Sequence, residues 1–231
     1  MKGSRVQPMS EARRLQFNKL VAVLYRICLY VAVTTGGVIF AIPFYWMIRT
    51  AIMPAWQIYI FPPEWIPAEI HLEYFNSPFE VFPFARWFLN SGIVATTSAI
   101  GAIISSAIVA FSFARLRTPF RDAIFVIVLA TMILPETVRL VPTYLLFVKL
   151  GWINTFRPLI VPDWFAPAFH VFLLRQFFLT IPKELDDAAL IDGCSPIGLL
   201  FRIHMPLSVP ALGVVAIFQF TFDWNDFLIP L

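Results

Sequence analysis

The chain has 231 residues, of which 59% are hydrophobic and only 13% are charged, and its mean hydropathy is +0.78. Soluble domains carry about twice that charged fraction, so the composition excludes an ordinary soluble globular protein. The net charge of +3 is small and gives no indication of nucleic-acid binding. The two cysteines, Cys28 and Cys194, lie in an apolar and a polar segment respectively and predict no disulfide.

Five apolar stretches predict an all-α, polytopic membrane protein. They cover residues 27–48, 90–114, 123–148, 158–178 and 206–231. The first stretch contains no charged residue over roughly 22 positions, which is enough for a helix to cross a bilayer. The second repeats small residues at helical spacing, a pattern that lets helices pack closely in lipid. We therefore expect a transmembrane domain over 27–231, preceded by an N-terminal segment, 1–26.

The distribution of basic residues predicts the orientation of these spans. Lysine and arginine dominate the segment 1–26 and the loop 115–121, so both are expected in the cytoplasm. The segment 50–86 is rich in proline, tryptophan and glutamate and is then expected outside. Alternation of the spans places residues 180–205 on the cytoplasmic side.

This cytoplasmic segment, 180–205, has the pattern of a helical hairpin. Thr180 is expected to cap a first helix, and Gly193 stands where a helix would end in a left-handed residue. Ser195 and Pro196 are typical of the start of a second helix. Periodicity alone leaves two alternatives open: an amphipathic hairpin lying on the membrane surface, or a loop that binds a partner.

The residues of the hairpin resemble the EAA loop of ABC importer permeases. The resemblance rests on an acid-Ala-Ala run, a glycine after three further residues, and later prolines. The matching residues are Asp187, Ala188, Ala189, Asp192, Gly193 and Pro206. Two positions depart from the family pattern: it usually has Glu where this chain has Asp187, and Ala where this chain has Cys194. In that family the loop docks on the ATPase.

Further motifs resemble the carbohydrate-importer branch of the family, and its second permease type in particular. They are the runs 172–178, 149–155 and 224–227. The resemblance implies the transmembrane fold of a type I ABC importer in the cell inner membrane, with membrane lipid around it. It also implies a second permease subunit, two ATP-binding-cassette ATPase subunits and an extracytoplasmic solute-binding protein. The expected activity is translocation of a small polar solute, a sugar or sugar-like molecule, by alternating access.

The family usually has a sixth span, whereas five are predicted here. The sequence ends within an apolar run that has no polar flank. We therefore expect a truncated product or a partial reading frame.

Catalytic and metal-binding patterns are absent from the sequence. No glycine is followed by lysine, so the phosphate-binding G-x-x-x-x-G-K-[ST] loop is missing and any ATP hydrolysis is expected in a separate subunit. The three histidines are isolated, which predicts neither a metal site nor a cofactor. An ion-coupled secondary transporter or channel remains the main alternative, and a membrane-embedded enzyme is a third.

Polar residues at membrane depth are candidates for the solute pathway, since such groups are costly in lipid. The candidates are Glu136, Asp163, Asp223, Asn225 and Asp226. Carboxylates and amides beside Trp224 would suit the hydroxyl groups and ring faces of sugars. The alternatives stay open: Glu136 with Arg139 fits a neutralised pair near the interface, and the residues 223–226 fit a cap on a helix end.

Overall fold

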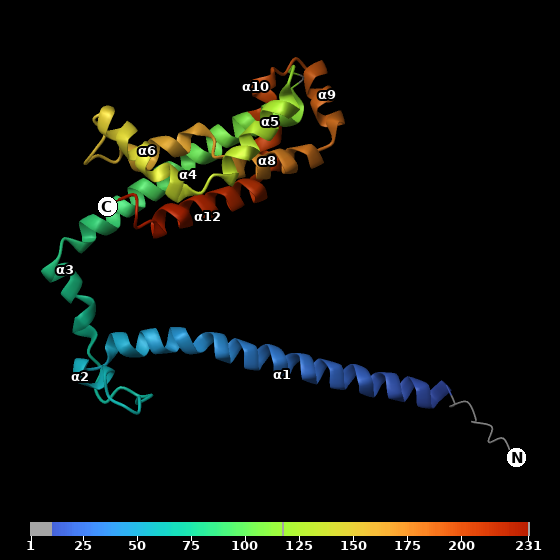
Figure 1. Cartoon of the computed structure of the whole chain (residues 1–231). Coiled ribbons are helices and arrows are strands. Elements are labelled where there is room, and N and C mark those ends of the chain that lie inside the picture. The colour runs from blue at the N-terminus through green and yellow to red at the C-terminus, as the bar shows by residue number, and fades with distance from the viewer. Residues whose placement is uncertain (1–10, 117, 231) are drawn as a thin grey trace, which may run out of the picture. The chain divides into compact units, whose positions relative to one another are not determined.

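The structure is a computed structural model that describes residues 11–116 and 118–230. It divides into two compact units, Met1–Pro83 and Phe84–Leu231. The described residues are helical or irregular, with no strand among them. This confirms the predicted all-α class. Each unit is described by itself below (Figure 1), and the transmembrane domain over 27–231 stays a prediction.

The first unit consists of a long apolar helix and a folded loop. Helix α1 runs over Glu11–Ile52 and contains the predicted span 27–48. The short helices α2 (Ala55–Ile58), η1 (Leu72–Phe75) and α3 (Ser77–Val81) follow within the predicted outer segment. The buried Gln57 side chain holds this loop together, because its amide donates to the Ile66 carbonyl at 3.1 Å and accepts from the Ala68 N–H at 2.9 Å.

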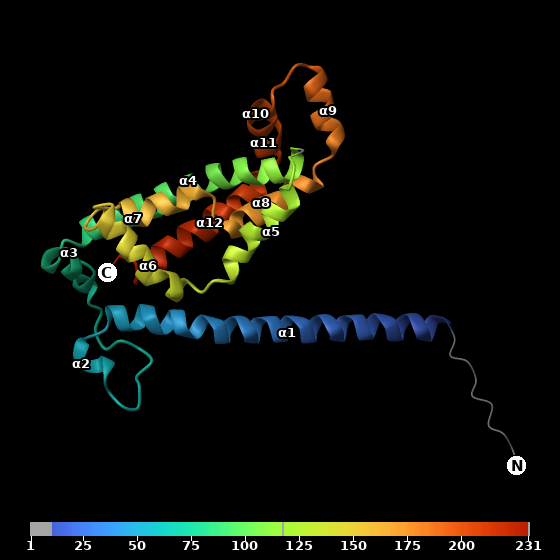
Figure 2. The same cartoon turned by 45° about the horizontal axis from the view of Figure 1, so that its top comes forward.

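The second unit is a bundle built around helix α4, which runs over Phe84–Arg115. Helices α8 (Ala168–Thr180) and α12 (Val209–Asn225) pack along α4, as both views of the bundle show (Figure 2). Small residues of α4 make this possible, since Ala95, Ala102, Ala107 and Ala110 are fully buried. The small-residue pattern predicted a close-packed helix here, and α4 has that role.

Serines of α4 also hold the irregular segment before α8. This segment comprises α7 (Arg157–Ile160) and η3 (Val161–Phe165). The Ser98 hydroxyl donates to the Leu159 carbonyl at 3.2 Å, and the Ser105 hydroxyl accepts from the Ala166 N–H at 3.1 Å. These bonds satisfy backbone groups that a non-helical segment would otherwise leave unpaired inside the bundle.

The third and fourth predicted spans are not continuous helices. Residues 123–148 form α5 (Arg121–Ala130) with η2 (Thr131–Ile133) and then α6 (Glu136–Lys149), and the helices on either side of the break lie at 100°. Proline explains the break, because Leu134 before Pro135 adopts an extended conformation. Residues 158–178 are interrupted before Pro167 by a left-handed residue instead, since Ala166 has a φ of 54°.

The described residues contain two helices long and apolar enough to cross a membrane, Asn18–Ile52 and Phe84–Arg115. Three bent helix pairs raise this number to as many as five if each pair forms one span. The fifth predicted stretch, 206–231, is helical in α12 only as far as Asn225. Its last residue, Leu231, lies outside the described residues.

Candidate docking hairpin and polar cluster

The predicted hairpin is present and its turn is built by glycine. Helix α9 runs over Lys183–Ile191, and Gly193 follows with a φ of +79°. The Cys194 N–H donates to the Ala189 carbonyl at 2.9 Å, and the Gly193 N–H donates to the Leu190 carbonyl at 3.0 Å. This pair of bonds is a Schellman motif, which ends a helix through a left-handed residue.

The chain restarts at Ser195, as the sequence predicts. Its hydroxyl accepts a hydrogen bond from the Gly198 N–H at 3.1 Å and so caps α10 (Pro196–Leu199). A π-helical turn, η4 (Leu200–His204), and the short helix α11 (Met205–Leu207) lead to α12. The prediction for Thr180 is wrong: this residue ends α8, and its hydroxyl donates to the Phe177 carbonyl at 2.7 Å. Pro182 stands at the N-terminus of α9 instead.

Most of the residues predicted to dock a partner lie on the surface of the hairpin. Asp187, Ala188, Asp192, Gly193 and Pro206 are exposed, and Ala189 is half-buried. Large apolar side chains accompany them, with Ile191 87% and Ile197 72% exposed. A surface pocket lies along the turn, lined by residues from Gly193 to Arg202. A polar segment that exposes apolar side chains around a fixed turn has the properties of a protein-binding surface.

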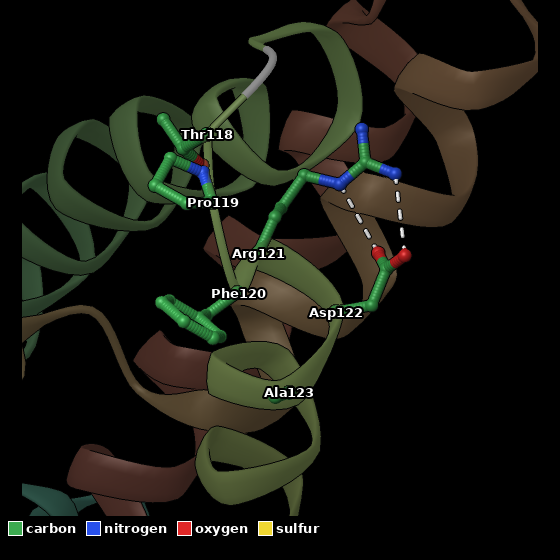
Figure 3. A pocket seen from close by; sticks show the side chains of 6 residues that line it. All are labelled: Thr118, Pro119, Phe120, Arg121, Asp122 and Ala123. Atoms are coloured by element: carbon green, nitrogen blue, oxygen red, sulfur yellow. Dashed lines mark hydrogen bonds and ion pairs between the residues drawn. The ribbon is translucent and has the colours of Figure 1, made fainter.

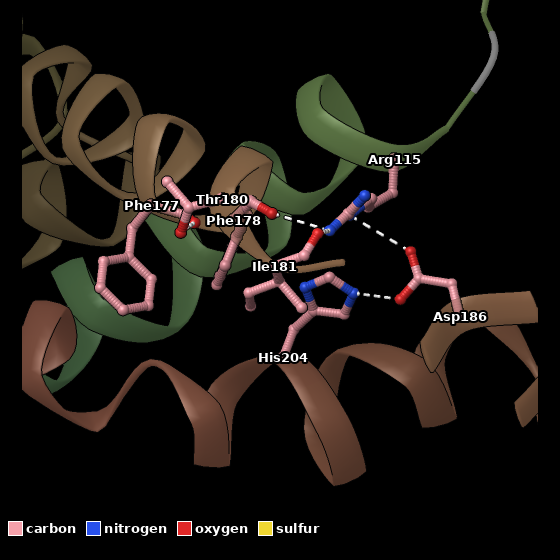
Figure 4. A network of polar contacts seen from close by, with 7 residues as sticks. All are labelled: Arg115, Phe177, Phe178, Thr180, Ile181, Asp186 and His204. Carbon is pink, nitrogen blue, oxygen red and sulfur yellow. Dashed lines mark hydrogen bonds and ion pairs between the residues drawn. The ribbon is translucent and has the colours of Figure 1, made fainter. Parts of the chain in front are cut away.

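A buried ionic network lies at the base of the hairpin (Figure 4). The Asp186 carboxylate of α9 lies 3.2 Å from Nε of Arg115 and 2.7 Å from Nε2 of His204. Nη2 of Arg115 also donates to the Phe178 carbonyl at 2.8 Å and to the Ile181 carbonyl. Burial lowers the pKa of His204, although the bond to Asp186 opposes this shift. His204, at the end of η4, is therefore neutral near pH 7 and donates its Nε2–H to the Asp186 carboxylate.

The loop between α4 and α5 contains a surface pocket lined by residues 118–123 (Figure 3). Nε of Arg121 lies 3.1 Å from the Asp122 carboxylate in this pocket. Nη2 of Arg175 lies 3.7 Å from the same carboxylate, and its guanidinium stands over the Phe125 ring at 4.1 Å. These contacts tie α8 to the start of α5.

Two of the predicted pathway residues meet inside the bundle. The Asp163 carboxyl of η3 interacts with the side chains of Ser98 and Gln219. The Gln219 amide donates to both oxygens of Asp223, at 3.2 and 3.1 Å, and its oxygen lies 2.9 Å from Nε2 of His170. We call these five residues, Ser98, Asp163, His170, Gln219 and Asp223, the polar cluster.

The other predicted pathway residues are not in this cluster. The Asn225 amide donates to the Thr221 carbonyl of its own helix at 2.7 Å. The Asp226 carboxylate accepts from the Leu228 and Ile229 N–H groups at 3.0 and 3.3 Å and shapes the turn after α12. The side chain of Glu136 lies outside the described residues, so its pairing with Arg139 stays a prediction.

The sequence predicts no functional role for six residues that organise these two sites: Arg115, Asp186, His204, Ser98, His170 and Gln219. From the sequence, Arg115 is one of the charges that predict the topology, and His204 is an isolated histidine. A signal was present, because Asp186 lies on the opposite side of α9 from Ala188 and an acid facing the bundle needs a partner. Gln219 was equally visible as a polar residue within an apolar helix.

The chain is similar to known transport proteins. The family model for binding-protein-dependent transport system inner membrane components matches residues 102–231. A probable ABC transporter permease protein of Pyrococcus horikoshii is 31% identical over 203 residues, which are 84% of this chain and 72% of that protein. The sn-glycerol-3-phosphate transport system permease protein of Agrobacterium fabrum is 41% identical over 146 residues, or 63% of this chain and 51% of that protein.

Two further similarities concern sugar-polymer transport. The arabinooligosaccharides transport system permease protein of Halalkalibacterium halodurans is 37% identical over 145 residues, covering 63% of this chain and 52% of that protein. The matches to this protein and to the Agrobacterium protein therefore span about half of each relative. A chain of a bacterial ABC transporter that imports alginate shares the fold, with a TM-score of 0.72 at 19% identity over 95% of this chain and 74% of that chain.

Proposed function

This chain belongs to the family of binding-protein-dependent transport system inner membrane components, and we propose from this premise that it is one permease subunit of an ATP-driven importer. The proposed complex joins it to a second permease subunit, two ATP-binding-cassette ATPase subunits and an extracytoplasmic solute-binding protein. The chain itself supplies half of the pathway, and ATP is hydrolysed in the separate ATPase. Alternating access of the two permease subunits moves the solute.

The observation that carries this proposal is the α9–Gly193–α10 hairpin. Most of its predicted docking residues are exposed, as are its large apolar side chains Ile191 and Ile197. Ala188 is exposed and offers a small surface that a partner can approach closely. An ATPase that binds here can bias the pathway, since a partner shifts a conformational equilibrium only through contacts that differ between the two states.

We propose a small polar solute, a sugar or sugar-like molecule, as the cargo. The names of the relatives support this class, because they include transporters of sn-glycerol 3-phosphate and arabinooligosaccharides. The polar cluster supports it from within the chain, since Asp163, Gln219 and Asp223 offer carboxylate and amide groups that can bond hydroxyls. Intramembrane groups of this kind mark solute pathways in transport proteins.

The test is whether the hairpin turn is needed for ATPase binding. Replacement of Gly193 by valine places a β-branched side chain at φ +79°, at a cost of about 1–2 kcal/mol or more. We expect the ATPase to be lost from the affinity-purified complex while the chain stays inserted in the membrane. Co-purification of the ATPase, measured by immunoblot against the amount of permease, gives the result.

Gly151→Val is the matched control. Gly151 has a similar φ of +66°, and a Cβ there meets no atom within 4 Å, as at Gly193. It lies in the turn after α6, away from the hairpin sequence. The proposal predicts wild-type amounts of ATPase with Gly151→Val. Full retention of the ATPase by Gly193→Val would contradict it.

A further inference from the structure

Helix α9 is attached to the rest of its unit by a charge. Asp186 is the one buried residue of α9, and among the described residues this helix has no extensive packing contact with another helix. The half-buried Ala189 adds a partial contact to the core cluster. An amphipathic helix normally attaches through a stripe of apolar side chains. In α9 the single carboxylate of Asp186 makes the main contact in place of such a stripe.

The Asp186 carboxylate joins three parts of the chain at one point (Figure 4). One oxygen faces Arg115, the last residue of α4, and the other faces His204 at the end of η4. Arg115 also connects this network to the end of α8, because it donates to the carbonyls of Phe178 and Ile181. The side chains are 6% exposed for Arg115, 12% for Asp186 and 0% for His204.

Burial makes these contacts obligatory for the charged pair. A buried guanidinium or carboxylate that loses its partner leaves an uncompensated charge, so α9 cannot move away from α4 without a large cost. The hydrogen bonds from Nη2 of Arg115 to the Phe178 and Ile181 carbonyls, and the one between His204 and Asp186, are also directional, unlike apolar contacts that allow sliding. A displacement of α9 is therefore passed to the end of α4 rather than absorbed at the contact.

We propose that the Arg115–Asp186–His204 network is the mechanical joint through which movement of the docking hairpin reaches α4. This inference rests on the proposed function, because it assumes that an ATPase moves the hairpin. The three side chains act as positioning residues and do not bind the ATPase. Since α4 packs along α8 and α12 and contributes Ser98 to the polar cluster, the joint connects the ATPase to the proposed pathway.

The experiment uses the complete importer in nanodiscs and compares two conditions, without nucleotide and with ATP plus vanadate. Hydrogen–deuterium exchange of peptides from α4 reports its movement without any solute. In the wild type we expect exchange in the cytoplasmic half of α4 to change by about fivefold or more between the two conditions, a usual lower bound for coupled sites. In Asp186→Asn and Arg115→Gln the ATPase stays bound, but α4 no longer responds to nucleotide.

Conservative variants separate the joint from a general loss of structure. His204→Gln keeps a donor for Asp186 and retains the response, whereas His204→Leu removes that donor and loses it. Arg121→Gln is the matched control, because it removes an arginine of the same region whose partner, Asp122, is outside the network. This variant responds as the wild type does.

Three results would overturn the inference. The first is a wild-type response of α4 in both Asp186→Asn and Arg115→Gln. The second is an α4 that ignores nucleotide in the wild-type complex. The third is loss of the ATPase from Asp186→Asn, which would make the network a part of the docking surface or the fold. Failure of the proposed function is distinguishable, since the ATPase would then be absent from the wild-type complex as well.

Discussion

At the scale of single residues, Gln219 links the acids of the bundle. Its side-chain amide donates to Asp223, its oxygen faces His170, and it also interacts with Asp163. It is buried in helix α12, which also carries Asp223. Polar groups that lie between helices are costly unless they are paired. The loss of one member of the cluster therefore leaves its partners unpaired and destabilises the arrangement.

Replacement of Asp223 by leucine removes the acceptor that both bonds of the Gln219 amide use. We expect uptake to fall about tenfold or more, in line with the loss of two hydrogen bonds of about 1 kcal/mol each. Uptake of radiolabelled arabinooligosaccharides and sn-glycerol 3-phosphate into proteoliposomes, normalised to inserted protein, measures this. Phe222→Leu, at an exposed position of the same helix, is the matched control. Equal uptake by wild type and Asp223→Leu would remove the cluster from the pathway.

Local backbone features of the hairpin were predictable from the sequence, apart from the cap expected at Thr180, whereas contacts between distant side chains were not. The left-handed Gly193 and the cap at Ser195 follow from rules that involve four or five neighbouring positions, and both are confirmed. Asp186 pairs with Arg115, which is 71 residues away along the chain, and with His204, which is 18 residues away. Apolar periodicity contains no information on which buried acid meets which base.

At the scale of the elements, η3 packs on α4 through a close contact between Gly101 and Trp164. A Cβ built on Gly101 would lie 2.2 Å from the indole of Trp164. The small-residue face of α4 is therefore needed at this position to admit a large aromatic ring. The same face admits α8 and α12 farther along the helix.

Replacement of Gly101 by valine should displace Trp164 and loosen the segment between α7 and α8. Overpacking of this kind costs about 1–3 kcal/mol. We expect a lower melting temperature of the purified chain in detergent, measured by the fluorescence of a thiol dye or by circular dichroism. Gly92→Val in the same helix is the control, since a Cβ there meets nothing within 4 Å. If Gly101→Val and Gly92→Val both had the melting temperature of the wild type, the contact between Gly101 and Trp164 would not support the fold.

Long apolar helices were predictable as elements, whereas their breaks were predictable only in part. Helices α1 and α4 follow from uninterrupted apolar runs, although both extend beyond the expected limits of 27–48 and 90–114. Pro135 interrupts the apolar run of the third span, and Asp163 and His170 interrupt that of the fourth. The bend of 100° after η2 could not be foreseen, because proline fixes a local conformation but tertiary packing fixes the angle.

At the scale of the whole molecule, the charge bias predicts a cytoplasmic N-terminus with the segment 50–86 outside. Cysteines introduced at Glu73 and Thr118, both exposed, test this in a variant without the native cysteines. We expect Glu73→Cys in intact cells to react with a membrane-impermeant maleimide, and Thr118→Cys to react only after the membrane is opened. The reverse pattern would invert the predicted topology.

The central claim is that the hairpin contacts an ATPase, and cross-linking tests it most directly. Ile191→Cys places a thiol on the most exposed large apolar residue of the hairpin, 87% exposed, in a Cys28→Ser and Cys194→Ala background. Ile66→Cys, from the predicted outer segment and 76% exposed, is the matched control. The complex is treated in membranes with a short thiol-to-amine cross-linker and analysed by mass spectrometry. The account predicts a covalent adduct between Ile191→Cys and the ATP-binding-cassette subunit and none from Ile66→Cys, whereas failure of Ile191→Cys to reach that subunit in an intact complex would contradict it.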